Sequence, residues 1–300
     1  ELEKEYEPKL INIHMTIGAP TFFLIVLFLI SVAAGFLGSL LGLGGGMIVI
    51  PALTLLFHVD IHYAFGASIV SVIATSCGAA AAYVKEKITN IRIAMFLEVA
   101  TTVGAITGAT LLAVVRTPAL FIIFGIVLLL SFVPVIRRRQ EAPIKGTLSK
   151  QNGLSRRLRL EGKYYDEYLD REVSYEASKT PIAFGMMYIA GIISGLLGVG
   201  SGPFKVLSMD LAMRLPIKVS TTTSNFMIGV TAAASAGIYF ARGYINPFVA
   251  APVALGVLVG ATLGARWLPR AKNILIRRIF AIVLVIVAVQ MIFSGLGINI

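Results

Sequence analysis

Charged residues are scarce over long stretches of this chain. Asp, Glu, Lys and Arg make up 14% of its 300 residues, and 57% are hydrophobic, whereas about a quarter of a soluble domain is charged. Residues 22–43, 243–265 and 279–300 contain no charge at all. About 20 apolar residues suffice to span the hydrocarbon core of a bilayer. These stretches exclude an ordinary soluble domain and predict an all-α integral membrane protein.

Cysteine and histidine are also nearly absent. The single cysteine, Cys77, lies in an apolar segment, which excludes disulfides and thiolate metal clusters. The three histidines have no metal-ligand spacing, so we expect neither a metal nor another cofactor. The acidic start ELEKEYEPKL is unlike the basic start of a signal peptide. No Ser/His or metal constellation occurs at helical spacing, so an enzyme is not expected.

An internal duplication is the strongest pattern that is present. AGFLGSLLGLGGG, from Ala34, matches AGIISGLLGVGSG, from Ala190, and the same offset holds without a gap for some seventy further residues. Matched Gly, Tyr and Asn residues do not recur by chance as apolar residues do. The offset pairs Ser68 with Ser224, Thr75 with Thr231, Tyr83 with Tyr239 and Asn90 with Asn246.

Each half is predicted to hold five membrane segments. In the first half they are 21–42, 46–58, 63–84, 92–114 and 118–136; in the second they are 181–199, 203–214, 219–241, 247–268 and 275–294. The second segment of each half follows a glycine cluster and is too short to cross fully. The predicted parts are therefore a tail (1–20), a first repeat (21–136), a polar loop (137–179) and a second repeat (180–300).

Basic residues then select the topology, because they gather on the cytoplasmic side. Five segments per half, with the chain entering from outside, place twenty-one Lys/Arg on the side of the central loop and four on the other side. Four segments per half give a weaker bias. The sequence thus predicts a multi-pass protein of the cytoplasmic membrane with both termini outside and the loop inside. An odd number of segments inverts the two repeats relative to each other, as in many secondary transporters.

The two glycine clusters are the first candidate site. Gly44, Gly45 and Gly46, with the preceding Gly42 and Leu43, interrupt one hydrophobic run, and Gly200, Ser201 and Gly202 interrupt the other. Unwound backbone in a membrane is tolerated where it lines a cavity, and a helix that starts there favours an anion. We expect Gly202 to cap the second short helix, with Pro203 as its first residue. The alternative is close helix packing through small residues.

The predicted segments contain two acids, Glu98 and Asp210, and one basic residue that lies well inside a segment rather than near its end, Lys205. Lys205 lies deep in a segment, where its ammonium can attract an anion; alternatively it reaches the interface along a short helix. Glu98 is the candidate for proton coupling, with burial as an ordinary acid the alternative. Asp210 precedes Arg214 by four residues, which is typical of a surface ion pair.

Small polar residues follow the short segments in both halves. Ser68 and Ser224 occupy equivalent repeat positions, and Asn225 is polar where its partner is Ile69. Their side chains can donate hydrogen bonds to an anion without binding it too tightly, or bond to neighbouring helices instead. In the central loop, 156–169 is expected to form an amphipathic helix on the membrane surface.

The glycine motifs and their spacing resemble the TauE/SafE family of sulfite and organosulfonate exporters. The likeness covers AGFLGSLLGLGGGMIVIPAL, its copy AGIISGLLGVGSGPFKVL, and the two-repeat layout of nearly the whole chain. It implies transport of sulfur-containing or related carboxylate anions, coupled to protons. An anion channel on the same scaffold is the alternative. The expected partners are a small anionic substrate and the lipid bilayer, not nucleic acid; a homodimer is left open.

Overall fold

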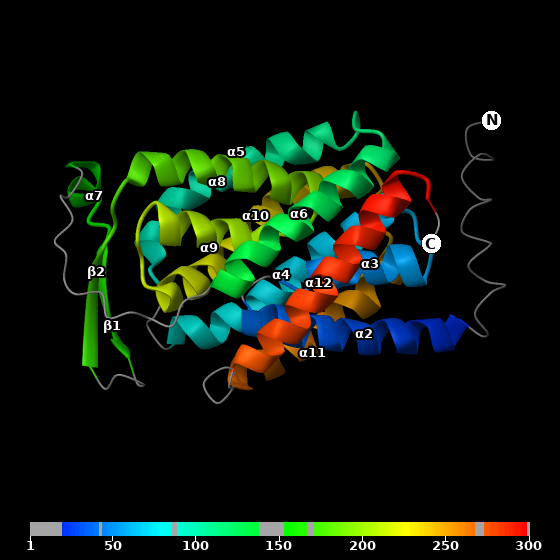
Figure 1. The fold of residues 1–300 in the computed structure, drawn as a ribbon, viewed down its shortest axis with the longest axis horizontal. Coiled ribbons are helices and arrows are strands. Elements are labelled where there is room, and N and C mark those ends of the chain that lie inside the picture. The colour runs from blue at the N-terminus through cyan, green and yellow to red at the C-terminus, as the bar shows by residue number, and fades with distance from the viewer. Residues whose placement is uncertain are drawn as a thin grey trace.

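The computed structural model describes residues 20–41, 44–85, 89–137, 153–166, 171–267 and 273–298. Gly42 and Leu43, most of the predicted tail and parts of the polar loop lie outside these ranges. Most of the described chain is helical (Figure 1).

The first half contains five helical segments close to the predicted positions. They are α2 (Pro20–Leu41), α3 (Gly46–Pro51) continued by the π-helix η1 (Ala52–Leu56), α4 (Ile61–Lys85), α5 (Ile91–Leu111) and α6 (Thr117–Arg137). The short segment α3–η1 changes its winding directly after Pro51, which has no backbone N–H to donate. At 1.5 Å per residue this segment reaches about half way across a bilayer core.

The second half repeats this order. Its helices are α8 (Thr180–Leu197), the short α9 (Gly202–Leu211), α10 (Ile217–Ala241), α11 (Pro247–Trp267) and α12 (Asn273–Gly295). Each begins and ends within about three residues of the position that the sequence predicts.

Helices of one half pack mainly against helices of the other. Helix α2 packs along α11, and α5 packs along α8. These two contacts are equivalent, because the repeat offset turns α2 into α8 and α5 into α11. Helix α4 also packs on α11, and the repeat offset makes this contact equivalent to that of α10 with α5. The pairs α4 with α10 and α6 with α12 each join a helix to its own repeat partner. The packing is therefore unchanged when the two halves are exchanged.

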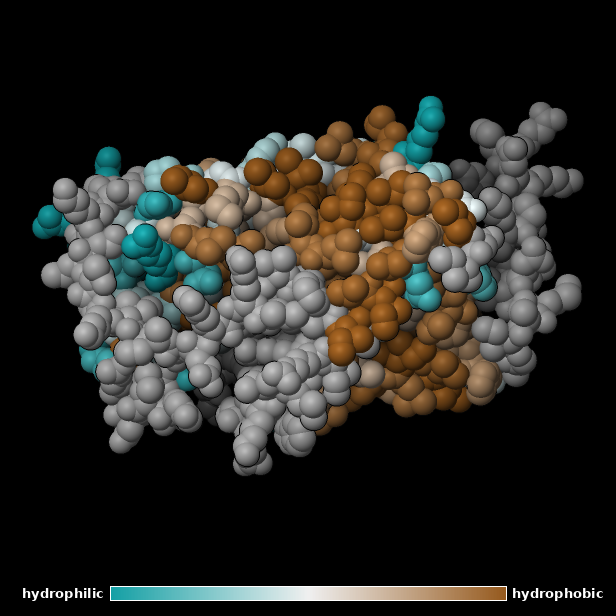
Figure 2. All heavy atoms as spheres, viewed as in Figure 1, coloured by the Kyte–Doolittle hydropathy of each residue, from teal (hydrophilic) through white to brown (hydrophobic). Residues whose placement is uncertain are grey.

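The outer surface of the bundle is apolar. Within the described residues, six helices are long and apolar enough to cross a membrane: α2, α4, α5, α8, α10 and α11. Large hydrophobic side chains such as Leu29, Val103 and Leu255 stand exposed on them, as expected for helices that face lipid. In Figure 2 hydrophobic residues cover the surface over α6 and α12, while hydrophilic residues gather at the end that carries the strands.

The polar loop contains a β-hairpin, which corrects the prediction of a surface helix over 156–169. A short helix α7 (Gly153–Arg157) precedes the antiparallel strands β1 (Glu161–Asp166) and β2 (Arg171–Glu176). The hairpin packs against the start of α5, where Asn90 Nδ2 donates to Tyr175 Oη at 3.0 Å. Burial raises the pKa of the Tyr175 hydroxyl. The two strands pair with each other, and a search for helical periodicity cannot reveal such a pairing.

Candidate functional site

The two glycine breaks meet inside the bundle. Gly44 and Gly200 both have a left-handed backbone, with φ of 75° and 74°. A Cβ placed on Gly44 would lie 3.8 Å from the carbonyl oxygen of Val199, so the two chain segments are in contact. Both glycines also lie against the same two side chains, Val72 and Ile228, which are repeat partners. The contact thus lies between residues that the repeat offset pairs.

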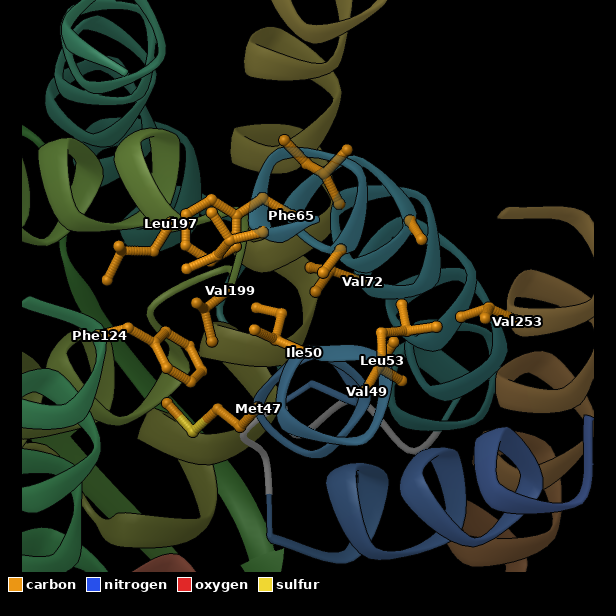
Figure 3. Close-up of a cluster of buried hydrophobic side chains, with 14 of the residues drawn as sticks. Met47, Val49, Ile50, Leu53, Phe65, Val72, Phe124, Leu197, Val199 and Val253 are labelled. Carbon is orange, nitrogen blue, oxygen red and sulfur yellow. The ribbon is translucent and has the colours of Figure 1, made fainter. Parts of the chain in front are cut away.

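The contact lies at the middle level of the bundle. Val72 is near the centre of α4, and Ile228 is near the centre of α10. Figure 3 shows the surroundings: Val72, Ile50 and Val199 approach one another, with Met47 and Phe124 on one side. The unwound backbone is thus enclosed by packed protein, as such backbone must be at membrane depth.

Hydroxyl groups join the two breaks. Ser68 Oγ, on α4, donates to the carbonyl oxygen of Gly198 at 2.7 Å and lies against Gly46. Ser224 Oγ, on α10, donates to the carbonyl oxygen of Gly202 at 3.2 Å. Gly45 is bound in a similar way, since its N–H donates to Thr75 Oγ1 at 3.3 Å. Each long central helix therefore holds the start of a short helix.

The start of α9 differs by one residue from the prediction. Ser201, not Gly202, is the N-cap, and it has a left-handed backbone with φ of 45°. That conformation is unusual for a residue other than glycine. Within the described residues, the buried Ser201 Oγ has no hydrogen-bond partner, and neither has the Nδ2 of Asn225, the residue after Ser224.

Lys205 is completely buried in the first turn of α9. Its side chain is 0% exposed, and its backbone N–H donates to the carbonyl oxygen of Ser201. Among the described residues the Lys205 ammonium has one hydrogen-bond acceptor, the hydroxyl of Thr231 on α10. Since an ammonium carries three donors, two are left without a partner there. The side chain is thus not exposed at an end of the bundle, and its role in attracting an anion stays a prediction.

Thr231 connects this lysine to Glu98, on α5. Thr231 Oγ1 lies 2.6 Å from Glu98 Oε1, and the glutamate is 5% exposed. Thr102 Oγ1 also donates to Glu98 Oε1, at 3.4 Å, and Thr101 Oγ1 lies 3.4 Å from the hydroxyl of Thr231. The other carboxylate oxygen, Oε2, has no partner among the described residues. A buried acid and a buried base thus share one hydroxyl.

These polar residues occupy only one of two equivalent places. Under the repeat offset, Lys205 corresponds to Val49, Glu98 to Ala254 and Thr101 to Val257, and all three counterparts are apolar. Val49 and Val257 are buried. A symmetric scaffold therefore carries its charged cluster on one side only.

The sequence indicated most of these residues separately but not their connection. Glu98 and Lys205 come from different halves, and no local pattern brings them together. Thr231 stood out only as the repeat partner of Thr75, and nothing in the sequence marked Thr101 or Thr102. Asp210, by contrast, is exposed near the end of α9 and is not part of the cluster.

Comparison with known proteins matches most of the chain to the family that its glycine motifs resemble. The family model described as Sulfite exporter TauE/SafE matches residues 27–291. The "Probable membrane transporter protein YunE" of Bacillus subtilis is 26% identical over 279 residues, which cover 91% of this chain and 98% of that protein. YdhB, another "Probable membrane transporter protein" of the same organism, is 27% identical over 245 residues, or 81% and 88% of the two chains.

A "Probable membrane transporter protein" of Xylella fastidiosa is 23% identical over 87% of this chain and 92% of its own. No solved structure matches the chain.

Proposed function

The chain belongs to the sulfite exporter TauE/SafE family of membrane transporters, and on that basis we propose that it is a secondary transporter for a small anion. The substrate would be sulfite, an organosulfonate or a related sulfur-containing or carboxylate anion. It would cross the cytoplasmic membrane, with the two termini outside and the central loop inside.

One observation carries this proposal: a fully buried lysine lies in the first turn of a short helix that starts at a break in the middle of the bundle. The free N–H groups and the dipole of such a helix favour an anion. The ammonium adds a full positive charge. Burying an ionisable residue at membrane depth costs free energy, so such residues usually serve a function. The proposed substrate site comprises Gly44, Gly45, Gly46, Ser68, Gly200, Ser201, Gly202, Lys205, Ser224 and Asn225.

The direction of the helices supports inverted repeats. In Figure 1, α2 starts at the end of the bundle where α12 finishes, whereas its repeat partner α8 starts at the opposite end, beside the β-hairpin. Repeats inverted in this way place a substrate between them at the membrane midplane, where rocking of one unit against the other opens the site to each side in turn.

A carrier is favoured over an anion channel by the burial of the site. The ammonium of Lys205 and most of Glu98 are closed off from solvent, whereas an open pore would expose its binding groups to water. Saturable flux with counterflow would identify a carrier, and large single-channel currents would identify a channel.

Flux of radiolabelled sulfite into proteoliposomes tests the function directly. We expect saturable flux in the unaltered protein and loss of flux in Lys205→Ala. Lys163→Ala is a matched control, because that lysine is exposed on the hairpin, where its Nζ lies 2.9 Å from Glu172 Oε1. Normal flux in a folded Lys205→Ala protein would remove the proposed site. Absence of flux for sulfite, organosulfonates and short carboxylates in the unaltered protein would remove the proposed function.

A further inference from the structure

The cluster of Glu98, Thr231 and Lys205 is electrically balanced without a ligand. One carboxylate and one ammonium share the Thr231 hydroxyl, and among the described residues no ion pair joins the two charges directly. A net charge buried in a membrane protein is costly, because neither lipid nor packed protein replaces the lost water. Any anion that enters must therefore be compensated.

We infer that the Glu98 carboxylate occupies the place of the substrate anion at Lys205 and Thr231, and that an entering anion displaces it only as Glu98 takes up a proton. This inference rests on the proposed function and specifies its coupling. Before binding, Glu98 and Lys205 sum to zero charge. After binding, a singly charged anion and Lys205 sum to zero, and Glu98 is neutral. One proton from solution accompanies each anion.

The hydrogen bonds of Thr231 fit such an exchange. Its hydroxyl has a single proton and three acceptors within reach: Glu98 Oε1 at 2.6 Å, the carbonyl oxygen of Met227 at 2.9 Å and Thr101 Oγ1 at 3.4 Å. When Glu98 is displaced, the hydroxyl can turn to Met227 or to the anion and still be satisfied. The two remaining donors of the Lys205 ammonium are available to anion oxygens.

No second charge competes for this role in the described parts of the surrounding helices. Glu98 is the charged group that acts on the Lys205 ammonium. The other titratable side chains on the described parts of α5, α8, α9 and α10 are Arg92, Tyr188, Asp210, Lys218 and Tyr239.

These five groups lie away from the cluster of Glu98, Thr231 and Lys205. Arg92 and Asp210 are exposed, and Tyr188 is 37% exposed. Lys218 precedes Thr231 by thirteen residues, about 20 Å along α10. The hydroxyl of Tyr239 donates to the carbonyl oxygens of Gly195 and Leu196.

Binding of methanesulfonate to purified protein in nanodiscs tests the coupling. This probe keeps one negative charge from acidic to alkaline pH, so any pH dependence belongs to the protein. Where Glu98 is ionised, we expect the affinity to fall by about tenfold for each unit of rising pH. Calorimetry in buffers of different ionisation enthalpy should show uptake of about one proton per anion.

Two variants locate the proton. Glu98→Gln imitates the protonated acid, so it should bind at every pH without proton uptake. Asp60→Asn removes an exposed carboxylate instead and should keep the unaltered pH dependence.

The role of Lys205 needs a paired substitution. Lys205→Met alone leaves Glu98 without its counter-charge and can fail to fold. The double variant Glu98→Gln/Lys205→Met restores neutrality, and it should fold but lose binding by at least tenfold.

Different outcomes would separate the two proposals. Binding without proton uptake in the unaltered protein, or an unchanged pH dependence in Glu98→Gln, would overturn the exchange and leave anion transport intact. Failure of the unaltered protein to bind or transport sulfonates, sulfite and carboxylates would overturn both.

Discussion

At the scale of single residues, the Thr231 hydroxyl stabilises two buried charges at once. It accepts from Lys205 and lies in hydrogen-bond contact with Glu98. Replacing it by a methyl group would leave the ammonium without its acceptor and the carboxylate without its closest donor. The cost of leaving a buried polar group unsatisfied is about 1–3 kcal/mol, and more for a charged group.

We therefore expect Thr231→Val to lower the free energy of unfolding by at least about 2 kcal/mol, measured by denaturation in detergent. Thr231→Ser, which keeps the hydroxyl, should recover most of the loss. Thr110→Val is the control, because the exposed Thr110 hydroxyl bonds to the carbonyl oxygen of Thr107 in its own helix. Equal stability of the two valine variants would contradict the role of this hydroxyl.

Gly44 and Gly200 offer a second test, since they share a backbone conformation and differ in surroundings. A left-handed backbone costs a residue with a Cβ about 1–2 kcal/mol. A Cβ on Gly44 finds its nearest neighbour at 3.6 Å, whereas one on Gly200 would lie 2.6 Å from Ile228 and 2.7 Å from Val72. Gly44→Ala should cost about 1–2 kcal/mol of stability, and Gly200→Ala about 1–3 kcal/mol more.

Thermal unfolding of the two alanine variants side by side gives this difference. Because the backbone strain is common to both, the difference reports the packing between the breaks. If Gly44→Ala were the less stable variant, the close contact of Gly200 with Val72 and Ile228 would be wrong.

The sequence could predict the candidate residues because each lay in a conspicuous local setting. Lys205 was a charge inside an apolar segment, and the glycines interrupted hydrophobic runs. The link from Lys205 through Thr231 to Glu98 could not be predicted, because it depends on how α5, α9 and α10 pack. A threonine within a helix usually bonds to its own backbone, as Thr231 also does to Met227.

At the scale of the elements, glycine allows the closest helix pairs to touch backbone to backbone. Cβ atoms on Gly191 and Gly195 of α8 would overlap the carbonyl oxygens of Thr101 and Ala105 on α5. The equivalent pair shows the same feature, where Gly260 of α11 lies against the carbonyl oxygen of Val32 on α2. Small residues at such contacts are what holds helices together in a membrane. Glycine at these three positions therefore serves the close packing of helices.

Two glycines of α8 make a matched pair for a test. Gly195→Ala should push α5 away and lower stability by about 1–3 kcal/mol. A Cβ on Gly185 would meet no other described atom within 4 Å, so Gly185→Ala should be neutral or stabilise by up to about 1 kcal/mol through helix propensity. Unfolding in detergent measures both, and a Gly195→Ala protein as stable as Gly185→Ala would exclude the backbone contact.

Helix positions followed from hydrophobic runs and from the turns between them, so the sequence predicted all ten segments. The β-hairpin was missed for a physical reason. Its strands are short and charged, and its buried residues Tyr164 and Tyr175 pack against the start of α5 rather than within a local amphipathic face. Tertiary packing, not local propensity, selects strands there.

At the scale of the whole molecule, exchange of the two halves preserves the helix contacts but not the chemistry. The repeat offset relates two places in the scaffold, and one of them holds Val49, Ala254 and Val257 where the other holds Lys205, Glu98 and Thr101. In the transporter that we propose, one charged place compensates one anion at a time. Under that proposal the repeated scaffold supplies the movement, and the place where the two repeats differ supplies the binding site.

The same architecture predicts which turns share a side of the membrane. The hairpin contacts the turn before α5 through Asn90 and Tyr175. The turn between α5 and α6, which contains the exposed Arg116, lies at the other end of the bundle (Figure 1). Because basic residues gather with the hairpin, that end should be cytoplasmic.

Cysteine labelling tests this orientation. In a Cys77→Ser background, a membrane-impermeant maleimide should label Arg116→Cys in intact cells, and Lys163→Cys only in inverted vesicles. Cys77 must be removed because it is itself exposed. Labelling of both cysteines from one side would refute the crossing of α5, and the reverse pattern would invert the proposed orientation.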